Sequence, residues 1–181
     1  GGPCANSAHG CNSALATRTA MALGDWTITE AGFGADLGAE KFLDIKCRVA
    51  GIWPDVVCVV GTVRALKYHG GVDAGDLETE DVDAMLAGMV NLEHHLAVLQ
   101  DVYGLTPVVS LNRFPSDTDA EVEAAIAHLA RLGVRAESAE HWAKGGEGCL
   151  DLADAVIAAA DERDERGGAG PLHSYDLDAS P

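Results

Sequence analysis

Two hydrophobic patterns alternate along this chain, and their order predicts an α/β protein. Residues 56–60 are continuously apolar, as is typical of a strand buried in a parallel sheet, and residues 107–111 form a second, mostly apolar strand-like run. Residues 134–139 and the short β-branched segment 26–29 are further predicted strands. Turn-forming Gly, Pro, Asn and Asp residues separate these runs from helix-like segments.

Apolar residues at helical spacing fill the segments between the predicted strands. Gly104 and Gly133 follow two of these segments and are typical helix-ending residues. The predicted helices cover residues 12–23, 37–49, 79–103, 118–132 and 149–163. This order predicts a mainly parallel, doubly wound sheet with helices on both faces, in which ligands bind at the carboxyl ends of the strands.

Four turns with chemically distinctive residues fall at those predicted strand ends, namely residues 30–41, 62–71, 112–117 and 141–148. Phe114 and Trp142 offer flat faces for a planar ligand, and Arg113 and Lys144 lie beside them to meet its negative groups. The pattern predicts a heteroaromatic, anionic small molecule as ligand. The alternative is that the two aromatic residues simply pack in the core.

Composition narrows the classes of protein. A chain of 181 residues with 48% hydrophobic residues can bury one substantial core. A net charge of −17 argues against nonspecific nucleic-acid binding. Neither a membrane span nor a secretory signal is recognisable, so a cytoplasmic location is expected. The five cysteines lack CxxC spacing, and no metal-ligating residues are predicted.

Five separate motifs carry a resemblance to one enzyme family. They are GGPCANSAHGCNS at residues 1–13, TEAGFGADLGAEKF at 29–42, TVRALK with HGG within 62–71, NRFP at 112–115 and WAKGGEG at 142–148. In this order they resemble the formate–tetrahydrofolate ligases, the ATP-dependent formyltetrahydrofolate synthetases. The resemblance covers nearly the whole chain.

The resemblance also shapes the expected domain organisation. Family members carry a P-loop, but no G-x-x-x-x-G-K-[ST] sequence occurs here. The resemblance therefore implies an internal fragment, with residues 1–181 forming a single partial domain from the centre of the ligase. Its fold would be an incomplete P-loop NTPase-like sheet, with residues 161–175 as a helix end and loop. The full-length enzyme would be a homo-oligomer that uses small-molecule substrates.

By resemblance, the complete enzyme activates formate with ATP and Mg²⁺ to formyl phosphate, and N10 of tetrahydrofolate then attacks the formyl carbon. The same analogy adds a monovalent cation. Phosphoryl transfer gathers negative charge and needs cations and hydrogen-bond donors. The candidate catalytic residues are Arg64, Lys67 and His9. Structural ion pairs for Arg64 and Lys67, and a structural role for His9, remain alternatives.

The resemblance also assigns ligand contacts at the predicted strand ends. The candidate folate-binding residues are Phe114, Pro115 and Trp142, and the candidate nucleotide-binding residues are Phe33, Asn112 and Lys144. Asn112 follows a strand, where nucleotide-binding α/β proteins place a base-reading amide, so the sequence leaves pterin and adenine open at this site. Phe33 has the alternative role of a hydrophobic plug under its turn, and Lys144 that of a surface lysine.

Two classes of function follow. The first is a segment of a ligase that is inactive until it is joined to the P-loop portion. The second is a folate- or nucleotide-binding module without catalytic activity. A third reading is an unstable truncation with exposed sheet edges.

Overall fold

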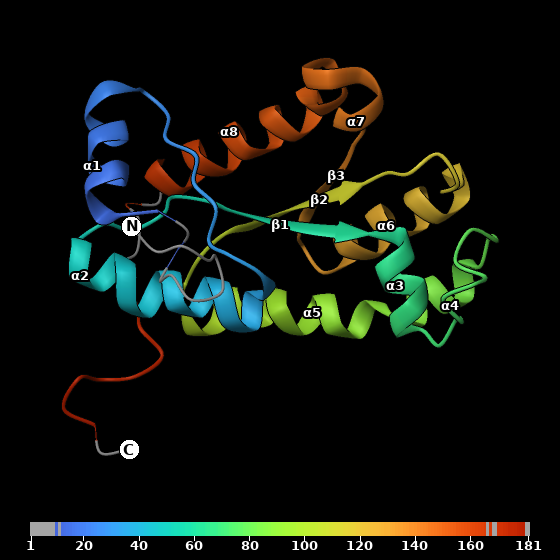
Figure 1. Cartoon of the computed structure of the whole chain (residues 1–181), viewed down its shortest axis with the longest axis horizontal. Helices are drawn as coiled ribbons and strands as arrows, with labels where there is room; N and C mark the ends of the chain where they lie inside the picture. The colour runs from blue at the N-terminus through green and yellow to red at the C-terminus, as the bar shows by residue number, and fades with distance from the viewer. Residues whose placement is uncertain (1–9, 11, 166, 168–169, 180–181) are drawn as a thin grey trace. The chain divides into compact units, whose positions relative to one another are not determined.

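The computed structural model describes residues 10, 12–165, 167 and 170–179 of the chain. The chain divides into two compact units. Residues 55–168 form the first, which we call the sheet unit, and residues 1–54 with 169–181 form the second, the helical unit. Figure 1 shows the elements of both units.

The sheet unit is built on three parallel strands. These are β1 (Val57–Thr62), β2 (Pro107–Asn112) and β3 (Arg135–Ala139), in the order β1-β2-β3. The arrows of β1 and β2 point to the same side of Figure 1. Thr62 pairs with Asn112, and Asn112 pairs with Ala139, so the three carboxyl ends lie at one edge. The predicted parallel α/β sheet is confirmed.

Eight helical elements surround these strands. They are α3 (Val63–His69), α4 (Val82–Ala87), α5 (Met89–Ala97), η3 (Val98–Val102), α6 (Asp119–Arg131), α7 (His141–Lys144), η4 (Gly145–Cys149) and α8 (Leu150–Glu165). The single helix predicted over residues 79–103 is wrong in detail, because the chain is divided there at Gly88 and changes to π-helical geometry at Val98. No helix among the described residues is long and apolar enough to cross a membrane.

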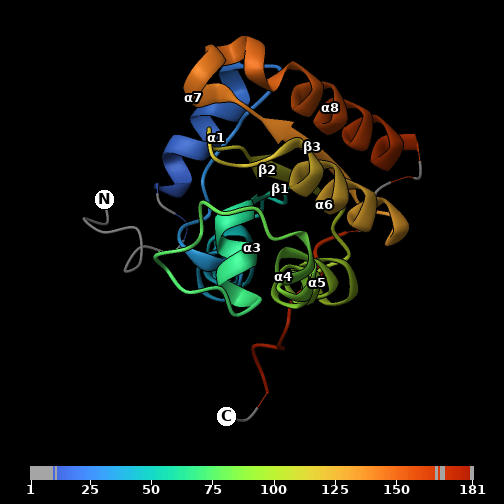
Figure 2. The ribbon, with the colours of Figure 1, turned by 90° about the vertical axis from the view of Figure 1, so that its right-hand side faces the viewer.

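Helices cover both faces of the sheet, as predicted. Alternate side chains of a strand point to opposite faces. Val108 of β2 packs against Ala155 and Ala159 of α8, whereas Val109 and Leu111 belong to the larger core formed with α3 to α6. Figure 2 shows α8 on one side of the strands and α4 and α5 on the other. The mostly apolar sequence of β2 therefore reflects burial on two sides. The prediction that residues 56–60 are equally buried is wrong, because Cys58 and Val60 of β1 are exposed.

The first helix after β1 was not predicted from the sequence. Thr62 ends the strand in an extended conformation, and its hydroxyl accepts a hydrogen bond from the Ala65 N–H at 3.1 Å. A threonine in this position is a helix N-cap. The segment interpreted as a turn thus begins with α3, and this places Arg64 in its first turn.

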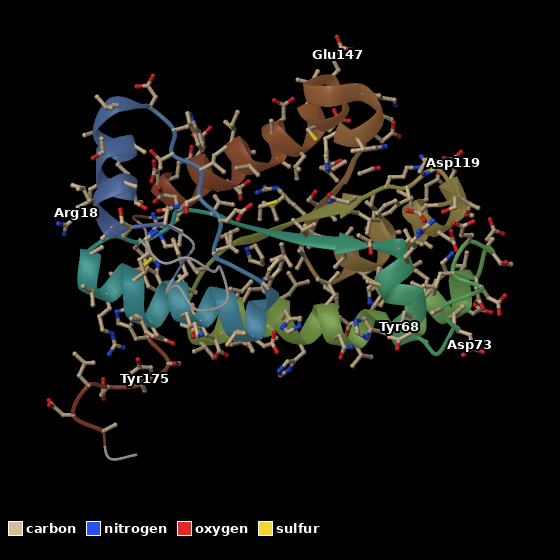
Figure 3. All side chains as sticks on the ribbon, in the orientation of Figure 1. Arg18, Tyr68, Asp73, Asp119, Glu147 and Tyr175 are labelled. Atoms are coloured by element: carbon tan, nitrogen blue, oxygen red, sulfur yellow. The ribbon has the colours of Figure 1, made fainter. Side chains whose placement is uncertain are left out.

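The helical unit contains no strand pairing in its described residues. Its elements are α1 (Ala14–Leu23), η1 (Gly34–Ala39), η2 (Lys41–Cys47) and α2 (Arg48–Ala50). The predicted strand at residues 26–29 is wrong, because no neighbouring segment pairs with it. The C-terminal segment lies against η2, where the Ser174 N–H and hydroxyl donate to Asp44 at 3.0 and 2.6 Å. The Arg48 guanidinium stacks over the ring of Tyr175, which Figure 3 labels.

Candidate functional site

The carboxyl ends of the three strands and the loops that follow them form one continuous edge, which we call the rim (residues 62–64, 112–117 and 139–148). The Arg113 N–H extends the β2–β3 ladder by donating to the Ala139 carbonyl at 3.0 Å. The Glu140 N–H donates to the Gly148 carbonyl at 2.9 Å and closes the loop after β3. Backbone hydrogen bonds therefore hold the loop after β2 beside the loop after β3.

The turn at residues 112–117 is fixed by Asp117. This carboxylate is buried and accepts the Phe114 N–H at 2.8 Å, while the Asp117 N–H donates to the Phe114 carbonyl at 3.0 Å. The Arg113 guanidinium donates to the Asp117 carbonyl at 3.2 Å. Reciprocal hydrogen bonds of this kind restrict the backbone on both sides of Phe114.

Helix α6 begins directly after this turn with a capping box. The Thr118 hydroxyl accepts the Glu121 N–H at 3.2 Å, and the Glu121 carboxylate accepts the Thr118 N–H at 3.1 Å. Two otherwise unsatisfied N–H groups of the helix are satisfied in this way. Asp119, labelled in Figure 3, lies in the first turn of the same helix. The rim is thus built on rigid elements.

The two predicted stacking residues are exposed at this rim. Trp142 is 88% exposed on α7, and Phe114 is 41% exposed with the Arg64 guanidinium 4.9 Å from its ring centroid. Pro115 is exposed beside Phe114. This exposure weighs against the alternative that Phe114 and Trp142 are core packing residues.

The cations of the rim are paired with carboxylates. Arg113 lies 2.6 Å from Asp119 and 3.7 Å from Glu140, and Lys144 forms an ion pair with Glu140. The hydrogen bond from Lys144 is the main cause that holds the pKa of Glu140 below its ordinary value. Arg64 lies 2.7 Å from Glu78. A ligand anion would have to compete with these carboxylates for the cations.

Lys67 is completely buried below the rim. Its ammonium lies 2.9 Å from the equally buried Glu121 carboxylate and donates to the Thr79 carbonyl at 2.9 Å. Burial alone would raise the pKa of Glu121, but hydrogen bonds from Lys67, Asp81 and Thr118 outweigh it and lower the pKa. This geometry supports the structural ion pair that the sequence left as an alternative.

The remaining predicted residues lie in different places. Asn112 ends β2, and its amide oxygen accepts the Ser110 hydroxyl at 2.9 Å. Phe33 is 77% exposed in the helical unit, between Gly32 and Gly34 at positive φ. His9 lies outside the described residues. The structure therefore brings Arg64, Asn112, Phe114, Pro115, Trp142 and Lys144 together on one rim.

Sequence reasoning missed the acidic residues that organise the rim, namely Glu78, Asp117, Glu121 and Glu140. One signal was present, because Thr118-x-x-Glu121 before an apolar run is the sequence pattern of a capping box. A second signal was the i,i+4 spacing of Glu140 and Lys144, whereas no local pattern marks Glu78, whose role depends on its contact with Arg64. Among the described residues no group of three or more His, Cys, Asp or Glu is arranged to hold a metal ion.

Replacing Asp117 with asparagine tests the buried carboxylate. Burial is the main cause that raises the pKa of Asp117 above 3.8, and its Oδ1 makes no hydrogen bond within the described chain. Asparagine keeps an acceptor for the Phe114 N–H without the charge, so we expect stability at neutral pH to change by less than about 1 kcal/mol.

The pH dependence has a definite sign. A raised folded pKa gives the wild type extra stability below the ordinary value of 3.8, and this is lost as the pH rises through the folded pKa. The free energy of unfolding of the wild type should therefore increase relative to that of Asp117→Asn as the pH falls. Urea unfolding followed by circular dichroism measures this difference. Asp117→Ala, which removes the acceptor, should cost about 1–2 kcal/mol at neutral pH. A loss of that size in Asp117→Asn would contradict the prediction.

Comparison with known proteins agrees with these motifs. The family model described as formate–tetrahydrofolate ligase matches residues 1–179. A formate–tetrahydrofolate ligase of Methylobacillus flagellatus is 53% identical over 91% of this chain and 30% of its own length. The ligase of Lacticaseibacillus paracasei is 59% identical over 90% of this chain and 29% of its own length, and that of Methylibium petroleiphilum is 52% identical over 97% and 31%.

These relatives extend well beyond the part matched here. The chain spans about three tenths of their length. The match to the family model covers the strands, the rim and the described elements of the helical unit. The chain belongs to the formate–tetrahydrofolate ligase family.

Proposed function

We propose that this chain supplies the folate-binding rim of an ATP-dependent ligase that joins formate to tetrahydrofolate as part of a longer enzyme. The product is 10-formyltetrahydrofolate, formed through formyl phosphate. Membership of the ligase family supports the reaction, and the two exposed aromatic side chains on neighbouring rim loops support the folate site. By itself the chain is inactive as a ligase.

The proposed reaction has two steps. A formate oxygen attacks the terminal phosphorus of ATP, the bond from that phosphorus to the bridging oxygen breaks, and ADP leaves. The resulting formyl phosphate carries an activated carbonyl carbon. N10 of tetrahydrofolate then attacks that carbon, the carbon–oxygen bond to phosphate breaks, and N10 loses its proton. Mg²⁺ would neutralise charge on the ATP phosphates in the first step. Stabilisation of developing charge by fixed donors governs both steps.

The rim fits a planar ring better than a triphosphate with its Mg²⁺. Phe114 and Trp142 present apolar faces, and stacking on each would contribute on the order of 1 kcal/mol beyond area burial. The cations Arg64, Arg113 and Lys144 are already paired with carboxylates. The pterin of tetrahydrofolate is therefore the proposed occupant, with Pro115 shaping the slot, and adenine is the competing one.

The predicted catalytic residues differ in access. Arg64 lies at the rim, within reach of a bound ligand, whereas Lys67 is sealed below it. We assign Lys67 a structural role in holding α3 against α6. Lys144 lies in the same short helix, α7, as Trp142, where it can bind either the folate glutamate or a nucleotide in competition with Glu140.

A folate- or nucleotide-binding module without catalysis is the second candidate. One observation favours it, because the hydrogen bonds that build the rim all lie within residues 62–148 of the sheet unit. Such a rim can bind a ring independently of the rest of the enzyme. Binding without ATP turnover is its expected signature.

Calorimetric titration of the 181-residue chain with tetrahydrofolate tests the site. We expect micromolar binding in the wild type that weakens about tenfold in both Phe114→Ala and Trp142→Ala, because each change removes a stacking face. Tyr68→Ala is the control, since Tyr68 is an exposed aromatic in α3 outside the rim. Equal losses in all three variants would contradict a specific slot.

ADP added as a competitor shows whether the rim binds the pterin ring or adenine. If ADP displaces tetrahydrofolate, the slot also accepts adenine, and Asn112→Ala should then weaken ADP more than tetrahydrofolate. If ADP leaves tetrahydrofolate binding unchanged, the pterin assignment is supported. An absence of tetrahydrofolate binding in the wild type would contradict both the rim proposal and the binding-module alternative.

A further inference from the structure

The two faces of the Phe114 ring are unequal, because Arg64 covers one of them. Arg64 extends from the first turn of α3, and its guanidinium carbon lies 4.9 Å from the ring centroid. Its Nη2 donates to Glu78 at 2.7 Å and to Ser116 at 3.2 Å. Helix, loop and turn thus hold the guanidinium against the ring.

We propose that Arg64 is a positioning residue, which fixes Phe114 as a one-sided stacking platform and leaves the opposite ring face to the ligand. The proposal rests on the proposed function for the identity of that ligand, a planar pterin. It gives Arg64 a role through Phe114, in place of the phosphate contact predicted from the sequence.

The contacts of Arg64 favour positioning over phosphate binding. An arginine that receives a phosphate normally presents two N–H groups side by side. Here Nη2 is taken by Glu78 and Ser116, and Nε is buried without a hydrogen bond in the described part of the chain. A phosphate bound side by side through both terminal nitrogens would have to displace Glu78 or Ser116 from Nη2, whereas the ring face is already in contact. The contacts of Arg64 therefore favour the cation–π interaction with the Phe114 ring.

Phe114 is held from two directions. Asp117 fixes the backbone through the Phe114 N–H, and Arg64 fixes the ring through its face. An exposed aromatic without such support would lose rotamer freedom when a ligand binds. In this chain the rotamer freedom of Phe114 is already restricted in the folded state. The entropy of ordering the ring is therefore lost on folding and not on ligand binding, so the ligand binds more tightly.

The chain allows a direct test of the ring contact. It has three phenylalanines, Phe33, Phe42 and Phe114, so labelling with 4-fluorophenylalanine gives three ¹⁹F resonances. Phe114→Leu identifies the resonance of Phe114. In Arg64→Met this resonance should move, because the cation over the ring is gone, while the other two stay in place. Arg64→Lys, which keeps the charge but not the planar group, should restore part of the shift.

Arg131→Met is the matched control, since Arg131 lies in the last turn of α6 and should move none of the three resonances. An unchanged Phe114 resonance in Arg64→Met would overturn the proposal. This outcome does not depend on any ligand, so it can be told apart from a failure of the folate site itself.

Tetrahydrofolate affinity tests whether this contact affects ligand binding. Arg64→Met should weaken binding about three- to tenfold through the loss of ring positioning. In the Phe114→Ala background the same change should have no further effect, because Arg64 acts through the ring. Additive losses would show that Arg64 touches the ligand directly and would overturn the positioning role. If the wild type binds no tetrahydrofolate, the proposed function fails, while the fluorine shifts still decide the contact.

Discussion

Replacing Lys67 with methionine is expected to lower the free energy of unfolding by about 3–5 kcal/mol, because it leaves the Glu121 carboxylate buried without its partner. Both side chains are completely buried, and the Nζ–Oε1 distance is 2.9 Å. Glu121 also caps α6 and accepts the Asp81 N–H at 2.9 Å before α4. One carboxylate therefore joins α3, α4 and α6, and removal of its cation affects all three.

Urea unfolding followed by circular dichroism measures this loss. Lys144→Met is the matched control, since the Lys144–Glu140 pair lies at the surface, where solvent screens it, and its loss should leave the stability nearly unchanged. The double variant Lys67→Met/Glu121→Leu should recover part of the loss, because it removes both buried charges. Equal effects for Lys67→Met and Lys144→Met would show that burial of the first pair has no energetic consequence.

The same pair gives the stability a pH dependence. Hydrogen bonds hold the folded pKa of Glu121 below its ordinary value of 4.5, in spite of burial. A lowered folded pKa means that ionised Glu121 contributes stability above 4.5, and that this is lost as the pH falls through the folded pKa. The stability difference between the wild type and Glu121→Gln should therefore shrink on acidification below about pH 4.5. A difference that grows on acidification would contradict the lowered pKa.

The sheet could be predicted from sequence because its signal is local. The apolar runs at residues 56–60 and 107–111 predict buried strands, and they appear as β1 and β2 with nearly the predicted bounds. Only β2 is buried on both faces, because β1 exposes Cys58 and Val60. The segment at 26–29 has similar β-branched residues but forms no ladder. Strand formation requires a partner, and a partner is a property of the fold that no short segment carries.

The rim could be predicted in its aromatic residues but not in its charges. Phe114 and Trp142 stand beside Gly, Pro and cations, and the structure exposes both. Lys67 and Arg64 are three residues apart, and the sequence gives no reason to distinguish them. In the structure Lys67 forms a buried ion pair with Glu121, whereas Arg64 stacks on Phe114. Their partners lie 54 and 50 positions away in the chain (121 − 67 and 114 − 64), so only tertiary contact separates the two roles.

Gly88→Ala is expected to destabilise the sheet unit by about 3 kcal/mol or more, at the upper end for overpacking. A methyl group on Gly88 would overlap the Leu66 carbonyl oxygen and lie 2.7 Å from the Gly70 nitrogen. Gly70 is in the reciprocal position, with a methyl group there overlapping the Ala84 carbonyl oxygen and lying 2.6 Å from its carbonyl carbon. Helices α3 and α4 thus meet backbone to backbone, where no side-chain rotation can relieve a clash.

Thermal unfolding followed by circular dichroism checks this prediction, and Gly75→Ala is its control. Gly75 lies in the loop between α3 and α4, no atom of the described residues lies within 4 Å of the position that its Cβ would take, and its φ is not positive. Gly75→Ala should therefore leave the midpoint unchanged or raise it slightly. Because α3 carries both Arg64 and Lys67, separation of α3 from α4 in Gly88→Ala should also weaken tetrahydrofolate binding, which Gly75→Ala should leave intact. A stable Gly88→Ala variant would mean that the two helices can move apart without loss, and the close contact would then not be what fixes α3 at the rim.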